Sequence, residues 1–228
     1  MRLFSIFVIA AAMTFSSASV AEEKRSWSAE AKLRLAAVGE CVATTSPVRA
    51  GRLMREDFTT SSYESGLKRL ATDNRSCWRE NRLRASHGLP FAGAISEALL
   101  KQVEGSLVSR VIAASGAEVP TYATLDRIST CIVRARPGVT ASLLQTEIGS
   151  EAEQQAVMAM ADKVSACSRE AGFEEPLRNI RYLLATASYR LVAAHESQDT
   201  SNANVTADGQ ELEVPHGATV ILAAEAAE

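Results

Sequence analysis

Four cysteines are the residues whose type and spacing most directly suggest chemistry in this sequence. A cysteine can serve as a nucleophile, a metal ligand or half of a disulfide, and its neighbours distinguish these uses. The chain has no C-x-x-C redox pair and no C-x-x-C-H haem attachment motif. Its cysteines also lack the close spacing that zinc ligands usually have. We therefore expect disulfides, with no metal and no cofactor.

A second candidate is a cluster of arginines around a tryptophan in the stretch RSCWRENRLR. Arg75, Arg79 and Arg82 fall at helical spacing, so they share one face if this segment is a helix. Together with Trp78 they form a candidate binding site for an anionic surface, such as lipopolysaccharide phosphate or an acidic glycan. The alternative is a solvated helix end, because arginines near a helix C-terminus interact favourably with the helix dipole.

No catalytic constellation is recognisable in the sequence. It contains no G-x-S-x-G, S-x-x-K, Walker, H-E-x-x-H or calcium-loop motif. The histidines are His87 in a predicted loop, His195 at a predicted helix end and His216 in the C-terminal tail. We therefore assign no catalytic residue, and the sequence favours a protein that is not an enzyme.

The elements that position these residues form an internal repeat with an offset of ninety residues. This offset aligns Cys41 and Cys77 with Cys131 and Cys167, and it also aligns the proline that follows the first cysteine of each pair. Four cysteines allow three pairings. A duplication with one disulfide in each copy selects Cys41–Cys77 and Cys131–Cys167. We name the copies unit 1 (22–118) and unit 2 (119–198).

Each unit is predicted to contain four helices, so the predicted fold class is all-α, with two homologous four-helix units in tandem. Apolar residues recur at three- and four-residue spacing, hydroxyl residues precede several stripes, and prolines stand at helix starts. The predicted helices of unit 1 run from Ser28 to Val42, Pro47 to Arg55, Thr59 to Trp78 and Phe91 to Gly116, and those of unit 2 from Leu125 to Arg134, Pro137 to Thr146, Glu151 to Ala171 and Pro176 to His195.

The two ends of the chain differ from the helical units. Residues 1–21 combine Arg2, an apolar stretch and the small-residue ending Ser19-Val20-Ala21, which predicts a secretory signal peptide. No later stretch is apolar and long enough to predict a membrane span. The polar segment 199–228 is predicted to be a disordered extension, with a small hairpin as the alternative. We therefore expect a periplasmic or secreted protein.

The charge balance argues against general nucleic-acid binding. The formal net charge is −3 at pH 7. Proteins that bind nucleic acid without sequence preference neutralise phosphates with clustered lysines and arginines, which gives a basic domain. We expect no nucleic-acid partner.

The pattern C-[VI]-x4-P-x5-L-[ML], a later cysteine and the alanine-rich stretch AGAISEALLK resemble a set of exported hypothetical proteins of Gram-negative bacteria. Those proteins carry the same duplicated two-cysteine helical unit behind a signal peptide. The resemblance covers roughly residues 30–195, and unit 1 departs from it by having Ala92 where an arginine is expected. It implies an exported helical protein and no particular activity, so no functional residue is transferred.

Export, duplication and the lack of a polar constellation favour a non-catalytic interaction or structural module. Such a module would bind an envelope protein or an anionic envelope component. The alternative is a hydrolase acting on cell-wall or glycan material, with its site in the groove between the two units. A lone buried acid in that groove would favour the hydrolase.

Overall fold

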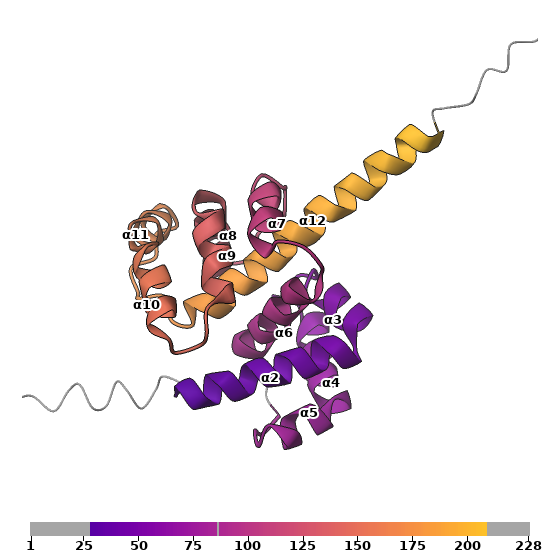
Figure 1. The fold of residues 1–228 in the computed structure, drawn as a ribbon, viewed down its shortest axis with the longest axis vertical. Helices are drawn as coiled ribbons and strands as arrows, with labels where there is room; N and C mark the ends of the chain where they lie inside the picture. The colour runs from indigo at the N-terminus through magenta and orange to yellow at the C-terminus, as the bar shows by residue number, and fades with distance from the viewer. Residues whose placement is uncertain (1–27, 86, 209–228) are drawn as a thin grey trace, which may run out of the picture.

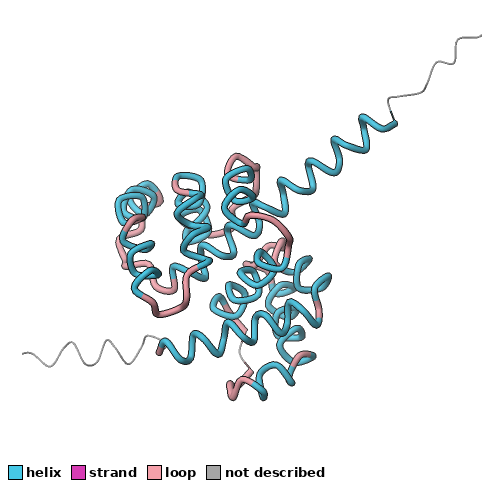
Figure 2. Tube along the Cα trace, viewed as in Figure 1, coloured by secondary structure: helices cyan, strands magenta, loops and turns pink. Residues whose placement is uncertain are grey.

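The computed structural model describes residues 28–85 and 87–208, so the predicted signal peptide at 1–21 lies outside the described residues. Within the described ranges the chain forms eleven helices and no strand, which confirms the all-α prediction (Figures 1 and 2). The helices are α2 (Ala29–Thr45), α3 (Pro47–Leu53), α4 (Ser61–Asp73), α5 (Arg75–Glu80), α6 (Leu89–Gln102), α7 (Leu107–Ala114), α8 (Thr124–Ala135), α9 (Pro137–Gln145), α10 (Glu151–Met158), α11 (Ala161–Glu170) and α12 (Ile180–Asp208).

The two units repeat the same order of helices. In unit 1, α2 and α3 are followed by the pair α4 and α5 and then by α6. In unit 2, α8 and α9 are followed by the pair α10 and α11 and then by α12. The third helix of each unit, which the sequence predicted as continuous, is interrupted. The interruption lies at Asn74 in unit 1 and at Ala159 and Met160 in unit 2.

Local sequence signals fix where several helices begin. The hydroxyl groups of Ser28, Thr60 and Ser150 accept hydrogen bonds from backbone N–H groups three residues further on, which caps α2, α4 and α10. Pro47 and Pro137 are the first residues of α3 and α9, where the missing proline N–H has no helical partner to lose. The Thr60 cap and Pro47 recur at the ninety-residue offset as Ser150 and Pro137, whereas α8, the counterpart of α2, starts after Ala123 without a side-chain cap.

The predicted helix from Phe91 to Gly116 is wrong, because two helices occupy this segment. The residues between α6 and α7 are not helical, and Val103, which was expected to face inward, is 48% exposed. Ser106 starts α7 by accepting a hydrogen bond from the Ser109 N–H. The buried residues of α7 belong to the core of unit 2, although the sequence boundary at 118 assigned them to unit 1.

The last helix is longer than the sequence indicated. α12 continues beyond His195 to Asp208 and extends past the other helices (Figure 1). Residues 199–208 of the segment expected to be disordered are therefore helical, and residues 209–228 lie outside the described part of the chain. Among the described residues, no helix has the length and apolar character that crossing a membrane requires.

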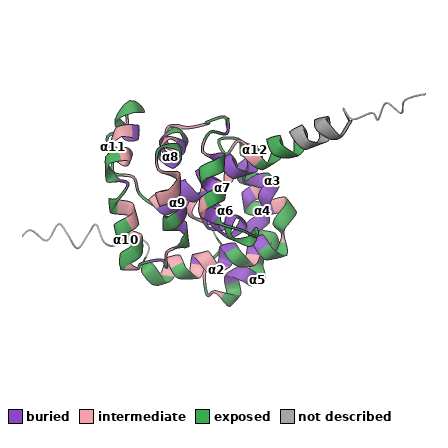
Figure 3. Cartoon of the chain, turned by 45° about the horizontal axis from the view of Figure 1, so that its top comes forward, coloured by how far each residue is buried: buried purple, intermediate pink, exposed green. Residues whose placement is uncertain are grey.

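The buried residues, which are purple in Figure 3, form two clusters, and α6 and α12 each contribute to both. Ten consecutive residues of α6, from Phe91 to Leu100, are buried. A Cβ on Gly39 of α2 would lie 2.5 Å from the Ala94 backbone, and one on Gly93 would lie 2.3 Å from the Tyr182 Cβ. These two glycines allow α2 and α12 to pack closely against α6. Because Tyr182 of unit 2 lies in the core of unit 1, the cores are joined.

Candidate functional site

The four cysteines form the two predicted disulfides. Cys41 bonds to Cys77 and Cys131 bonds to Cys167, with Cα atoms 5.8 and 5.9 Å apart. No cysteine of the described chain is free. A thiolate nucleophile and a thiolate metal ligand are therefore both missing from the described residues. The bonds instead join the first helix of each unit to the second part of its third helix.

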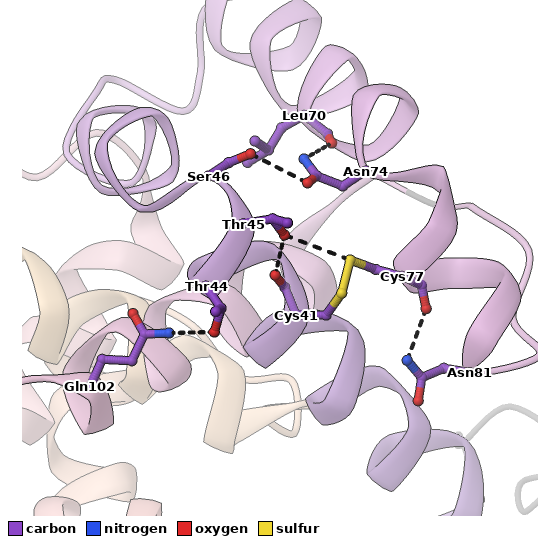
Figure 4. Close-up of a disulfide and its surroundings, with 9 residues drawn as sticks. All are labelled: Cys41, Thr44, Thr45, Ser46, Leu70, Asn74, Cys77, Asn81 and Gln102. Carbon is purple, nitrogen blue, oxygen red and sulfur yellow. Dashed lines mark hydrogen bonds between the residues drawn. A yellow bond between two sulfur atoms is a disulfide. The ribbon is translucent and has the colours of Figure 1, made fainter.

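Hydrogen bonds reinforce the link between the helices around the first disulfide (Figure 4). The Asn81 amide donates to the Cys77 carbonyl oxygen at 2.8 Å and closes the end of α5. The Ser46 hydroxyl donates to the Asn74 side chain at 3.3 Å, which connects the α2–α3 junction to the break between α4 and α5. The Ser46–Asn74 bond thus links the same two parts of unit 1 that the disulfide joins.

The arginine cluster predicted from the sequence is only partly brought together. Arg75, Arg79 and Arg82 are exposed, but Arg82 lies beyond the end of α5 with a φ of 54° and so does not continue the helical face. Trp78 is only 2% exposed and packs on Phe91, with ring centroids 4.9 Å apart. The prediction that Trp78 contributes to a binding surface is therefore wrong, because its indole fills the core of unit 1.

The three exposed arginines and Arg84, which is also exposed, lie within ten residues of sequence in α5 and the segment that follows it. Within the described part of the chain, none of the four guanidinium groups forms an ion pair. We call Arg75, Arg79, Arg82 and Arg84 the arginine end. The equivalent positions of unit 2 are Ser165, Arg169, Gly172 and Glu174. The basic character is thus confined to unit 1 and is not a general property of the repeat.

A buried ion-pair network that sequence analysis missed lies where the units meet. Arg181, in the first turn of α12, donates from Nη2 and Nε to the two carboxylate oxygens of Glu97 at 2.7 and 2.8 Å. Its Nη1 donates to Glu153 Oε1 at 2.9 Å, and Lys101 Nζ donates to Glu97 at 2.6 Å. Arg181 also donates to two backbone carbonyl oxygens at the end of α9. Every guanidinium nitrogen is therefore hydrogen-bonded, and the carboxylate of α6 is held from both units.

The network keeps Glu97 ionised. Burial by itself would raise the pKa of Glu97, but the hydrogen bonds and positive charge of Arg181, together with Lys101, lower it below its ordinary value. Burial raises the pKa of the neighbouring Tyr182 to about 12, and the negative charge of Glu97 adds to that rise. At neutral pH the Glu97 carboxylate is therefore ionised and the Tyr182 phenol is protonated.

A second buried pair lies further along α12. Arg190 Nη1 donates to both carboxylate oxygens of Asp126 at 2.7 Å, and its guanidinium lies 4.8 Å from the centroid of the Tyr122 ring. The Tyr122 ring in turn meets Phe58 of unit 1 edge to face, at 5.8 Å between centroids. The pair therefore orders the segment that joins the two units and contributes to the contact between them.

A groove of about 370 Å³ runs between α2 and α6 and reaches Tyr182 of α12. Its lining includes Glu97, Lys101 and Glu40 among small apolar residues. A lone buried acid in the groove between the units would have favoured the hydrolase hypothesis, and this groove lies mainly within unit 1, with Tyr182 as its lining residue from unit 2. Glu97 is buried there, but it is paired with two cations, so the groove offers no free acid or base of this kind among the residues described.

A signal for the network is visible in the sequence once its position is known. Glu97 stands within the run AGAISEALL, in which every other residue is small or apolar apart from one serine. A charge in a helix that is apolar all round must find a buried partner. The partner could not be named from the sequence, because Arg181 is eighty-four residues away and reaches Glu97 only through the crossing of α6 and α12.

Comparison with known proteins gives no relative, because no protein-family model, no curated protein and no solved structure matches this chain.

Proposed function

We propose that this protein is an exported, non-catalytic binding module that attaches to an anionic component of the cell envelope, in the periplasm or outside the cell. The two disulfides support export, because such bonds persist in oxidising compartments. The expected signal peptide at the start of the chain agrees with this location. The arginine end of unit 1 is the attachment surface in this proposal.

The observation that carries the proposal is the unpaired charge of the arginine end. Four exposed guanidinium groups lie within ten residues of sequence, and none is neutralised by an ion pair in the described chain. Guanidinium groups bind phosphate and carboxylate oxygens through paired N–H donors. Since the equivalent end of unit 2 lacks three of the four arginines, the charge is not needed to fold the repeat.

The chemistry of the interior also favours binding over catalysis. The carboxylates of Glu97 and Asp126 are each bonded to a buried arginine. The Glu97 pair joins the two units where α6 and α12 cross, and the Asp126 pair joins α8 to α12 within unit 2. An envelope hydrolase would need a free acid or base beside its substrate.

The experiment is a binding measurement on vesicles of phosphatidylcholine with and without phosphatidylglycerol. The wild-type protein should bind the anionic vesicles, and the binding should weaken as salt is added. The variant Arg75→Gln/Arg79→Gln/Arg84→Gln should lose most of this binding. The control Arg52→Gln/Arg127→Gln/Arg169→Gln removes the same charge from exposed positions elsewhere and should bind like the wild type.

Two results would contradict the proposal. Equal loss in both triple variants would show that only the overall charge matters, with no attachment surface at the arginine end. A hydrolytic activity on envelope material that one substitution abolishes would replace the binding module with an enzyme.

A further inference from the structure

A pocket in unit 2 is lined in part by the serine that corresponds to a buried tryptophan of unit 1. The pocket has a volume of about 510 Å³ and lies between α11 and the segment that precedes α12. Its apolar lining comes mainly from Val164, Phe173 and Leu177, and Ser168 also contributes to it. At the ninety-residue offset, Ser168 is the counterpart of Trp78.

Backbone geometry shows that the two positions are structurally equivalent. The Leu83 N–H donates to the Trp78 carbonyl oxygen at 2.9 Å, and the Phe173 N–H donates to the Ser168 carbonyl oxygen at 2.8 Å. The residue before each donor has a positive φ, 54° at Arg82 and 66° at Gly172. Both helices therefore end in the same type of turn, so residues 78 and 168 project from the same place in their units.

The consequence of the exchange is visible in the burial of the surrounding residues. In unit 1 the indole of Trp78 is buried and covers Phe91, which is only 1% exposed. In unit 2 the serine is too small to cover its surroundings, and Val164, Phe173 and Leu177 are only partly buried. Part of the apolar surface of these three side chains is thus open to water in unit 2.

We propose that this pocket of unit 2 binds the planar aromatic ring of a small molecule, in the place that the Trp78 indole occupies in unit 1. The volume lies within the range of small-molecule sites. A flat ring would cover the partly exposed apolar lining and gain the free energy of that burial. The charged lining residues Arg169, Glu174 and Glu175 are exposed, whereas Val164, Phe173, Leu177 and Ser168 are partly or fully buried. The proposal is independent of the arginine end.

The test is a titration of the isotopically labelled full chain with indole, followed by amide chemical shifts. Saturable shifts should be confined to residues 164–177. The variant Ser168→Trp supplies the missing side chain, so it should weaken indole binding at least tenfold. The matched variant Ser168→Ala keeps the pocket open and should bind like the wild type. The absence of saturable shifts in the wild type, or full binding by Ser168→Trp, would overturn the proposal.

A second measurement does not depend on a ligand. If Ser168→Trp places its indole as Trp78 does, the variant should melt at a higher temperature than the wild type, while Ser168→Ala should not. An unchanged or lower melting temperature, together with retained indole binding, would show that residue 168 does not face the pocket. The triple arginine variant should bind indole normally, which separates a failure of this proposal from a failure of the proposed attachment surface.

Discussion

At the scale of single residues, Arg181 shows how strongly the fold depends on one buried charge. It and Glu97 have side chains that are only 7% exposed. Burying two ions costs free energy of desolvation, which is offset only if the ions pair well and all their hydrogen-bonding groups have partners. Mutating one ion leaves the other buried without a compensating charge. Arg181 satisfies this condition because all three of its nitrogens have acceptors.

We predict that Arg181→Met lowers the free energy of unfolding by about 3–5 kcal/mol, the usual effect of breaking a buried ion pair. The comparison is Lys101→Met, which removes the other cation bonded to Glu97. Lys101 is 43% exposed, so its loss should cost less than about 1 kcal/mol. Urea unfolding of both variants measures the difference. Equal effects would mean that burial does not set the strength of the Arg181 contact.

The same network predicts how stability depends on pH. The pKa of Glu97 is lower in the folded state than the ordinary glutamate value, which is about 4.3. Its contribution is therefore fully present above that value and is lost as the pH falls through the folded-state pKa. We expect Glu97→Gln to show a smaller loss of stability than the wild type between neutral pH and pH values below about 4. Glu40→Gln, an exposed change in the same groove, should keep the wild-type dependence.

The structural roles of individual residues could be predicted from the sequence only where a covalent or local rule applied. The cysteine pairing followed from the duplication, because two copies of one unit share one bond pattern. Trp78 was misassigned, since its neighbouring arginines are exposed and its own burial depends on Phe91 of a later helix. The arginine partners of Glu97 and Asp126 could not be predicted for the same reason, because they lie on α12, far along the chain.

At the scale of elements, α6 is the helix on which the arrangement depends. It contacts α2 through Gly39 and Ala94, and α12 through Gly93 and Tyr182. The helix starts were largely predictable, because hydroxyl caps and prolines act locally. The helix breaks were harder to predict. Apolar periodicity continues from α4 into α5, so the change of direction at Asn74 leaves the pattern intact.

We predict that Gly93→Ala destabilises the protein although alanine is the better helix former. The added Cβ would lie 2.6 Å from the Tyr182 Cα, and a backbone atom cannot move aside as the end of a side chain can. Overpacking of this kind typically costs about 1–3 kcal/mol, which exceeds the gain in helix propensity of up to about 1 kcal/mol. Thermal unfolding measures the change. Gly138→Ala is the control, because its Cβ would meet only the Ile112 side chain at 3.7 Å.

At the scale of the whole molecule, the question is whether the two units fold as one. Each has its own disulfide and its own cluster of buried residues. The clusters nevertheless exchange residues, because Tyr182 of α12 belongs to the first and Leu100 of α6 to the second. The Arg181–Glu97 pair and the contact of Tyr122 with Phe58 cross the same boundary. These links predict that the two units unfold together in a single cooperative transition and not in two independent ones.

The decisive test removes a disulfide from one unit and observes the other. Each disulfide closes a loop of the same length, with a separation of 36 residues. The chain-entropy model assigns each loop about 3.8 kcal/mol, and measured losses are commonly about 2–4 kcal/mol. In a Trp27→Phe background, Trp78 is the sole tryptophan and reports on unit 1. If the units are coupled, Cys131→Ala/Cys167→Ala should shift the Trp78 fluorescence transition as far as the circular dichroism transition. The other outcome is that the Trp78 fluorescence transition stays where it is in the parent, while part of the circular dichroism signal is lost under milder conditions. In that case unit 1 is stable by itself, and the crossing of α6 and α12 joins two separately folded bodies.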